Sequence, residues 1–219
     1  MTGLLKGKVA VVTGGSKGIG YSIAERFTKE GAKVVISSRN KEELEVAANK
    51  LGSDCFAVDV SDSKSVLSLK EWLVDTHGSL DILVNCAGAV RYDGIMEVTE
   101  EDWDFLISVN LTGTFLMCNK LAPIMNDGGA ILNISSTLGL RAMKGAVAYC
   151  AAKGGVVNLT KAMALDLVDK VRVNCLCPGV VETPMVTNRI ETGQATRELS
   201  LIHISEPTRR YAISYAVFC

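Results

Sequence analysis

The fold is decided by the stretch KVAVVTGGSKGIG, residues 8–20. Its apolar start predicts a short buried strand, and residues 21–30 predict a helix with Ile23, Ala24 and Phe27 on one side. Glycines between strand and helix let the backbone approach a ligand, and a helix N-terminus presents free N–H groups to negative charge. A glycine-rich turn alone is a weak signal, but strand, glycine loop and helix in this order predict a phosphate-binding cradle.

The rest of the chain repeats this alternation, and its strands are nearly continuous apolar runs. Such runs are typical of a parallel sheet that helices cover on both faces. We therefore expect an α/β fold, a doubly wound, Rossmann-like parallel sheet in a single domain, because no linker interrupts the pattern. The further strands are expected at 32–38, 54–58, 80–84, 130–134 and 171–177, and the further helices at 40–51, 62–76, 99–125 (with a break near Gly113) and 148–167.

Composition narrows the class of function. Of the 219 residues 48% are hydrophobic and the net charge is -1, so a basic surface for nucleic acid is not expected and small-molecule chemistry is favoured. The seven cysteines are scattered and lack a His at ligand spacing, which indicates reduced thiols, a cytoplasmic protein and no metal site. Cys175 and Cys177 share one face of a strand, but as a metal pair they are the weaker interpretation. The N-terminal residues indicate neither a signal peptide nor a membrane span.

The end of the second strand bears on the choice of dinucleotide. In dinucleotide folds an acidic residue here accepts the ribose hydroxyls, whereas a basic residue suits a 2'-phosphate. This chain has Ser38 and Arg39 at that point, with Lys17 in the glycine loop, and no acid. NADP is therefore preferred over NAD, which stays an alternative; Arg39 could also be a solvated residue at a strand end.

Tyr149 and Lys153 lie four residues apart in a predicted helix and share one face. Free tyrosine titrates near ~10, and bringing it to neutrality takes roughly 4 kcal/mol. A close ammonium in a partly dry cleft can supply that. Ser136 follows a predicted strand, at the sheet edge where ligands bind. The three residues predict proton transfer to or from an alcohol or carbonyl oxygen, although Tyr-x-x-x-Lys also occurs by chance in helices.

Taken together, these motifs resemble the short-chain dehydrogenase/reductase family. The resemblance covers residues 6 to about 190, and it extends to the 3-oxoacyl-carrier-protein reductase-like and carbonyl-reductase-like members. One motif could be accidental, but the set in this order is specific. It comprises Thr13-Gly14-x-x-x-Gly18-x-Gly20, Asp59-Val60, Asn85-x-Ala87-Gly88, Asn110, Ser136, Tyr149-x-x-x-Lys153 and Pro178-Gly179.

The resemblance implies roles for individual residues. Tyr149 would be the acid/base, Lys153 would lower the pKa of Tyr149 and bind the nicotinamide ribose, Ser136 would hold the substrate oxygen, and Asn110 would support a water relay. A hydride would pass between the nicotinamide and a carbonyl carbon. Cofactor contacts are implied for Gly14, Ser16, Lys17, Gly18, Ile19, Gly20, Ser38, Arg39, Asp59, Val60, Asn85, Ala87, Gly88, Tyr149, Lys153, Pro178, Gly179, Val181 and Thr183.

The chain departs from the family pattern at two places. Cys86 stands where many members have a second Asn, and we expect only a small packing change. The match fades near Thr192, so we expect a dinucleotide-binding and catalytic domain at 1–192 and an unrelated tail at 193–219 that lacks the usual lid and last strand. Residues 199–211 resemble translated sequencing adapter; a genuine alternative terminus is the other explanation. Residues 211–217 alternate large and small side chains and could form a strand at the sheet edge.

The leading hypothesis is an NADP-dependent carbonyl reductase or alcohol dehydrogenase acting on a small molecule. The alternatives are a catalytically silent relative that binds dinucleotide or a full-length partner, and a chain that does not fold stably. A homodimer or homotetramer is expected by analogy, and an organellar address on a lost native C-terminus stays open. The substrate is expected to be mostly apolar, because by position the pocket would comprise Val90, Tyr92, Met143, Val181 and Met185.

Overall fold

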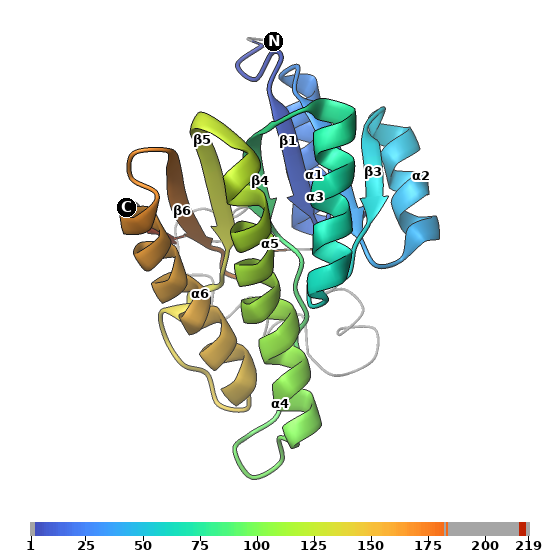
Figure 1. The fold of residues 1–219 in the computed structure, drawn as a ribbon. Helices are drawn as coiled ribbons and strands as arrows, with labels where there is room; N and C mark the ends of the chain where they lie inside the picture. Colours follow the sequence, from blue (N-terminus) through green and yellow to red (C-terminus); the bar gives the residue numbers. More distant parts are fainter. Residues whose placement is uncertain (1–2, 182, 184–214, 218–219) are drawn as a thin grey trace, which may run out of the picture.

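The computed structural model describes residues 3–181, 183 and 215–217, and it has helices on both faces of one sheet (Figure 1). The strands are β1 (Val9–Thr13), β2 (Lys33–Ser38), β3 (Asp54–Ala57), β4 (Leu80–Asn85), β5 (Met125–Ile134), β6 (Val171–Cys177) and β7 (Tyr215–Val217). The helices are α1 (Gly18–Lys29), α2 (Lys41–Leu51), α3 (Ser63–His77), α4 (Glu100–Ile107), α5 (Gly113–Leu121) and α6 (Val147–Asp166). A π-helical turn, η1 (Ser108–Thr112), and the 3₁₀ turns η2 (Ala122–Ile124) and η3 (Thr137–Gly139) complete the elements.

The strands are ordered β3-β2-β1-β4-β5-β6-β7. All neighbours from β3 to β6 pair in parallel, which confirms the doubly wound α/β fold. The chain winds outward from β1 in one direction and from β4 in the other, so a crevice opens between their carboxyl ends. β7 lies within the run 211–217 and pairs antiparallel with β6, with Leu176 opposite Ala216. The sequence predicts that the usual last strand is absent. In its place the structure has β7, a short strand that runs antiparallel to β6.

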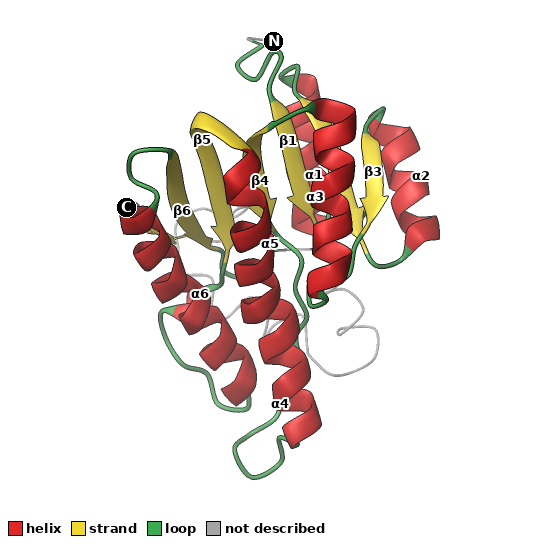
Figure 2. Ribbon diagram, viewed as in Figure 1, coloured by secondary structure: helices red, strands yellow, loops and turns green. Residues whose placement is uncertain are grey.

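Alternation along the strands builds a core on each face of the sheet. Val11 points into a cluster with Leu69 and Met117, which α3 and α5 contribute, and α6 packs against the same cluster. Val12 points the other way, into a cluster with Ala24 of α1 and Leu44 of α2. Figure 2 shows the resulting three layers. Because both faces of β1 are covered, all five of its residues are buried.

The helix predicted over 99–125 is present as α4, η1, α5 and η2 in succession. In place of a break near Gly113, the helix widens into the π turn just before that residue, and α5 continues from it. Gly113 is required there, because a Cβ would lie 2.7 Å from Cγ2 of Val60. By length and composition, residues Glu100–Ile124 pass the test for a membrane-spanning helix, but helices of this kind also line protein cores, and this one packs on the sheet.

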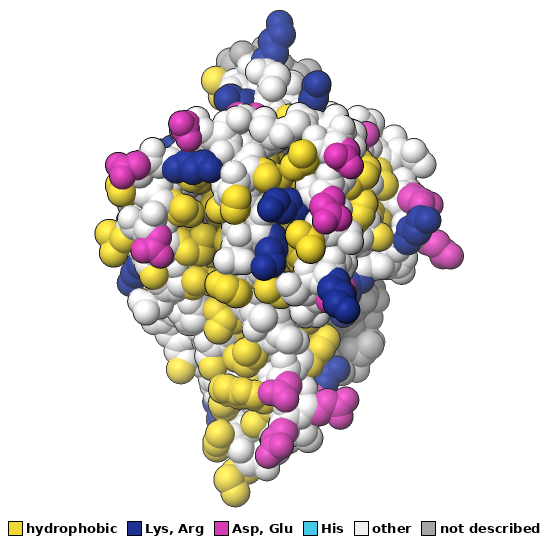
Figure 3. Space-filling model, in the orientation of Figure 1, with side chains coloured by type: hydrophobic (Ala, Val, Ile, Leu, Met, Phe, Trp, Pro, Cys, Tyr) yellow, Lys and Arg dark blue, Asp and Glu magenta, His cyan; other side chains and the backbone are white. Residues whose placement is uncertain are grey.

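Apolar side chains are also exposed on the side of the molecule that α4, α5 and α6 cover. Trp103 of α4 and Phe115 of α5 are among them, and the loop before α4 exposes Ile95 and Met96. Figure 3 shows hydrophobic side chains gathered over α4, α5 and α6. The expected dimer or tetramer stays a prediction.

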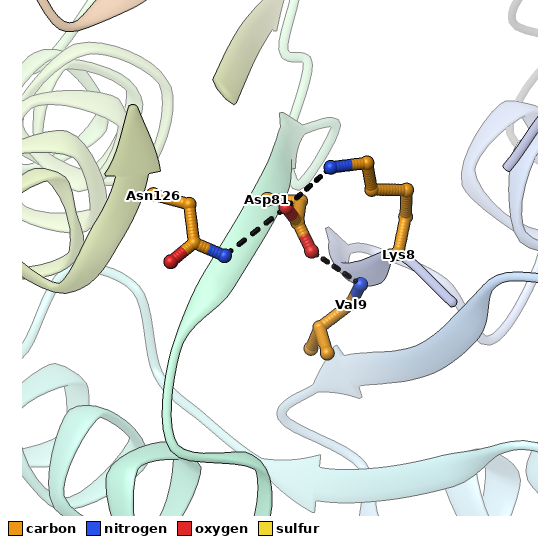
Figure 4. Close-up of polar contacts among 4 residues, drawn as sticks. All are labelled: Lys8, Val9, Asp81 and Asn126. Atoms are coloured by element: carbon orange, nitrogen blue, oxygen red, sulfur yellow. Dashed lines mark hydrogen bonds and ion pairs between the residues drawn. The ribbon is translucent and has the colours of Figure 1, made fainter. Parts of the chain in front are cut away.

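Asp81 joins three strands at the amino-terminal edge of the sheet (Figure 4). Its carboxylate accepts hydrogen bonds from the backbone N–H of Val9 (2.9 Å), the ammonium of Lys8 (2.9 Å) and the side-chain amide of Asn126 (3.1 Å). The register between β4 and β5 shifts at this residue. Asp81 therefore ties β1 and β5 to β4 and pairs the buried N–H of Val9 beside the point where the register shifts. Burial alone would raise the pKa of Asp81, but these bonds hold it below its usual value.

We predict that Asp81→Ala lowers the free energy of unfolding by about 2–3 kcal/mol at pH 7, because it leaves the buried N–H of Val9 unpaired. A lowered carboxyl pKa adds stability above the unfolded value, and this contribution is lost as pH falls through the folded pKa. Stability of the variant should therefore depend less on pH below about 5 than that of the parent chain. Urea unfolding at several pH values measures both effects, with the exposed Asp127→Ala as control. Equal acid sensitivity of parent and Asp81→Ala would contradict this role.

Candidate active site

The glycine loop and the first turn of α1 form the predicted phosphate cradle. The backbone at Gly14 and Gly18 has φ of +67° and +60°, a region that other residues rarely adopt. A Cβ at Gly20 would lie 2.4 Å from the carbonyl oxygen of Gly14, so the loop packs directly on the helix. Asn40, Asp62 and Thr99 cap α2, α3 and α4 with side-chain oxygens, whereas no side chain caps α1 and its first turn holds no acid. Its N–H groups are therefore open to an anion.

A cavity of about 820 Å³ extends from this cradle along the carboxyl ends of the strands. From the predicted cofactor set it is lined by Gly14, Ser16, Lys17, Gly18, Ile19, Gly20, Ser38, Arg39, Asp59, Val60, Ala87, Gly88 and Thr183. The cavity is also lined by residues that the motifs do not single out, namely Ser37, Asn40, Glu43, Val58, Cys86 and Val109. Most of them are chain neighbours of predicted residues, and this adjacency could have revealed them.

Glu43 changes the charge balance at the end of this cavity near β2. Its carboxylate lies 3.2 Å from the ammonium of Lys17, although the two residues are distant in sequence. Both side chains are about half exposed, so the pair contributes at most about 1 kcal/mol to stability. Arg39 lines the same cavity and forms no ion pair with any residue that the structure describes.

A second cavity of about 340 Å³ adjoins the first, and both are lined by Ile19, Cys86, Gly88 and Thr183. All four residues predicted to be catalytic line it, together with Pro178, Gly179 and Val181 from the predicted cofactor set. Val90, Tyr92, Met143 and Val181 of the predicted substrate pocket are present there as well, whereas Met185 lies outside the described residues. The structure thus brings together residues from several separate stretches of the chain.

Ser136, Tyr149 and Lys153 meet where β5 ends and α6 begins. Ser136 and Tyr149 share a hydrogen bond, and Ser136 also accepts one from the N–H of Leu138 at 3.1 Å, which holds its rotamer. The ammonium of Lys153 lies 5.8 Å from the centroid of the Tyr149 ring and donates to the carbonyl of Ile134 at 2.9 Å. The phenol, the hydroxyl and the ammonium therefore form one polar wall of the cavity.

Burial has the largest effect on the pKa values of Tyr149 and Lys153. It raises the pKa of Tyr149 to about 12, and the hydrogen bond with Ser136 only partly offsets that effect. Burial also lowers the pKa of Lys153 to about 8. Lys153 is not among the groups that shift the pKa of Tyr149 in this structure, so its role in lowering that pKa stays a prediction. The helical spacing is as predicted, but the ammonium is bonded to Ile134 and is not in contact with the phenol oxygen.

Asn110 lies in the π turn and is fully buried. Its amide nitrogen donates to the carbonyls of Ala89 and Leu106, each at 2.9 Å, and its oxygen accepts from the N–H of Ala89 at 3.2 Å. A Cβ on Gly88 would lie 2.9 Å from this oxygen and 3.5 Å from the Lys153 ammonium. Asn110 thus positions the strand-end loop beside the reactive wall, and the π turn supplies the geometry for it.

Asn85 is the predicted cofactor residue that lines neither cavity. Its amide donates to Oδ1 of Asn133 at 2.8 Å and to the sulfur of Cys118 at 3.1 Å, and Asn133 donates in turn to Thr160 at 2.9 Å. This buried chain of contacts links β4, β5 and α6 beneath the site. No sequence signal distinguishes it from a cofactor contact, since the inward or outward direction of Asn85 depends on strand register.

Thr13 holds the backbone at Cys86, so the fold of this loop does not depend on the side chain at position 86. Its hydroxyl accepts the backbone N–H groups of Cys86 and Ala87, each at 3.0 Å, and donates to the carbonyl of Val84. The backbone after β4 is thus fixed from β1 without help from the side chain at 86. Burial raises the pKa of Cys86 to about 11, which keeps this thiol protonated. Among the described residues no three His, Cys, Asp or Glu side chains gather as metal ligands would.

Comparison with known proteins agrees with this geometry. The family model described as short chain dehydrogenase matches residues 8–194. The uncharacterized oxidoreductase YxbG of Bacillus subtilis is 41% identical over 209 residues, covering 90% of this chain and 77% of that protein. A 3-oxoacyl-[acyl-carrier-protein] reductase of Chlamydia trachomatis is 39% identical over 194 residues, covering 84% and 78%.

Solved structures show the same fold. A crystal structure of a variant of actinorhodin polyketide ketoreductase with NADPH aligns with a TM-score of 0.82 and 34% identity, covering 87% of this chain and 77% of that one. A short chain dehydrogenase from Mycobacterium smegmatis aligns with a TM-score of 0.76 and 35% identity, covering 79% and 77%. The chain belongs to the short-chain dehydrogenase/reductase family: it is an oxidoreductase that binds a nicotinamide dinucleotide.

We predict that replacing the buried ammonium changes how stability depends on pH. The pKa of Lys153 is about 8 folded and 10.5 unfolded, so between these values the unfolded chain binds more protons and the free energy of unfolding rises with pH. From pH 7 to 9.5 the parent should gain about 2 kcal/mol relative to Lys153→Met. The buried cysteines oppose this gain in both proteins and cancel in the difference. Urea unfolding of parent, Lys153→Met and the exposed control Lys161→Met measures it, and a pH-independent difference for Lys153→Met would contradict it.

Proposed function

We propose that this protein interconverts a ketone, or a 3-oxoacyl group, and a secondary alcohol with NADP(H), using Tyr149 as the acid/base. One observation carries the proposal. The hydrogen-bonded pair of Ser136 and Tyr149, with Lys153 beside it, lines a small cavity that opens into a cavity of dinucleotide size. A ligand in the larger cavity and one in the smaller would meet at this wall.

The residues of the larger cavity fit a dinucleotide. Gly14, Gly18 and Gly20 bring backbone where a Cβ would be strained or would clash, and the uncapped N-terminus of α1 suits a diphosphate. Arg39 and Lys17 suit a 2'-phosphate, and the cavity has Asp59 and Val60 in its lining. When bound, the nicotinamide supplies or accepts the hydride.

Side chains of the protein would donate the proton and hydrogen-bond the substrate oxygen. At neutral pH the raised pKa keeps Tyr149 protonated, so its phenol can donate to a carbonyl oxygen as negative charge develops there. Ser136 is held by Leu138 in a position to hydrogen-bond the same oxygen. Lys153 sits close enough to stabilise the phenolate that remains, and this stabilisation grows when substrate excludes water.

Preference for NADP is proposed on the charge of the adenosine end. No acid follows β2 at the position where one would accept ribose hydroxyls, and Arg39 lines the cavity. The ketoreductase to which this chain is similar is solved with NADPH. Glu43 works against the preference by pairing with Lys17, so Arg39 is expected to contribute more of the discrimination.

We predict that Tyr149→Phe lowers kcat for ketone reduction by about 10²–10⁴-fold, because it removes the proton donor. NADPH binding should be retained, since the phenol lines only the smaller cavity. Oxidation of NADPH with a panel of ketones, together with fluorescence titration of NADPH, measures both. Saturable binding by the parent without any turnover would instead favour the catalytically silent alternative.

We predict that Arg39→Ala raises the Kd for NADPH about 10-fold or more and changes the Kd for NADH much less, because charge-assisted bonds to a phosphate are lost. Lys41→Ala is the matched control. It removes the same charge from a neighbouring exposed residue that does not line the cavity. Fluorescence titration with both cofactors tests the expectation. An equal loss of affinity for NADPH and NADH would show that Arg39 does not bind the 2'-phosphate.

A further inference from the structure

The smaller cavity has an unbalanced charge. Besides Lys153, it is lined by the guanidinium-bearing Arg141, and no Asp or Glu is found among its described lining residues. Lys153 is 5% exposed and already donates to Ile134, whereas Arg141 is exposed. The cavity therefore has a reactive inner wall and a second, accessible cation toward solvent.

Arg141 is attached to the same backbone turn as Ser136. The hydroxyl of Ser136 caps η3 through the N–H of Leu138, and the N–H of Arg141 donates to the carbonyl of Thr137 at 3.0 Å. This turn fixes the backbone that bears the guanidinium relative to the hydroxyl that faces the reacting oxygen. A group bound by Arg141 would thus lie at a defined separation from the carbonyl being reduced.

The guanidinium has no partner within the described part of the chain. Arg91, the arginine in the loop that follows β4, differs: that side chain pairs with Asp102 and stacks over Phe105 at 4.6 Å. None of the hydrogen bonds or ion pairs of the described residues involves the Arg141 side chain. A guanidinium that lines a cavity without an acid nearby is available to an anionic ligand, which it can bind through two parallel hydrogen bonds.

We propose that Arg141 binds an oxyanion of the substrate, so that this site selects ketones that carry a carboxylate or a phosphate. The inference rests on the proposed function, whose substrate class it narrows. The apolar lining residues Val90, Leu138 and Met143 would cover the carbon atoms between the carbonyl and the anion. The expectation of a mostly apolar substrate then holds for the middle of the molecule and not for its far end.

The test compares charged and neutral forms of one substrate. Parent, Arg141→Gln and Arg141→Lys are assayed with NADPH and three compounds: a short aliphatic oxo acid, its methyl ester and a matching ketone phosphate. Arg141→Gln should lower kcat/KM about 10-fold or more for the anion that the site reads, carboxylate or phosphate, and should change the ester less than about 2-fold. Arg141→Lys should recover part of the loss, because a point charge replaces the bidentate fork.

Lys144→Gln is the matched control, since Lys144 is an exposed cation of the same loop that lines neither cavity. An equal loss in Lys144→Gln would mean that general attraction of anions, not a site, causes the effect. The proposal is overturned as well if Arg141→Gln affects acid, phosphate and ester alike, or affects none of them while the ester is reduced.

A binding measurement separates this proposal from the proposed function. Calorimetric titration of the protein, saturated with NADP, uses the saturated carboxylic acid and the alkyl phosphate of the same length, which cannot be reduced. Binding that weakens about 10-fold in Arg141→Gln supports the anion site even if no ketone is turned over, and it is then the proposed function that fails. Binding that is unchanged in Arg141→Gln overturns the anion site even if the ester is reduced.

Discussion

Two hydrogen bonds between the end of β5 and the middle of α6 determine the geometry of the site. The ammonium of Lys153 donates to the carbonyl of Ile134, and the hydroxyl of Ser135 donates to the carbonyl of Lys153 at 2.7 Å. Gly139 allows the turn between them to close, because a Cβ there would lie 2.6 Å from the Lys153 carbonyl. With strand end and helix joined in this way, Ser136 and Tyr149 can only meet in the same cavity.

The two edges of the sheet have different roles: contacts at one edge join strands, and contacts at the other hold the loops of the site. At the amino-terminal edge, Asp81 accepts hydrogen bonds from groups of β1 and β5, beside the shift in register between β4 and β5. At the carboxyl-terminal edge, Thr13 and Asn110 fix the strand-end loops by bonds to their backbone. Asp81 thus lies away from the site, and the described lining of the smaller cavity holds cations, neutral polar groups and apolar groups but no carboxylate. Without a carboxylate beside it, burial lowers the pKa of Lys153 to about 8, so its ammonium is close to titration at neutral pH.

Much of the fold and of the site could be predicted from sequence, because both depend on local patterns. Residues 171–177 form β6 as predicted, and strand, glycine loop and helix follow one another at 8–30 as the apolar and helical periods indicate. The motif residues are also local, so nearly all of them line the cavities. What the sequence does not reveal is long-range contacts. Asn85 bonds to Asn133 and lines neither cavity, and Glu43 reaches Lys17 from another helix.

By itself, the sequence determined the doubly wound sheet, the phosphate cradle and the residue types that meet at its edge, since these follow from periodicity and from motifs a few residues long. Only the tertiary structure decided their electrostatics. Spacing placed Lys153 one turn from Tyr149, but burial by β5 and α6 sets the pKa of both groups and directs the ammonium to Ile134. Desolvation depends on every element that packs around a group, and a single stretch of chain does not contain that information.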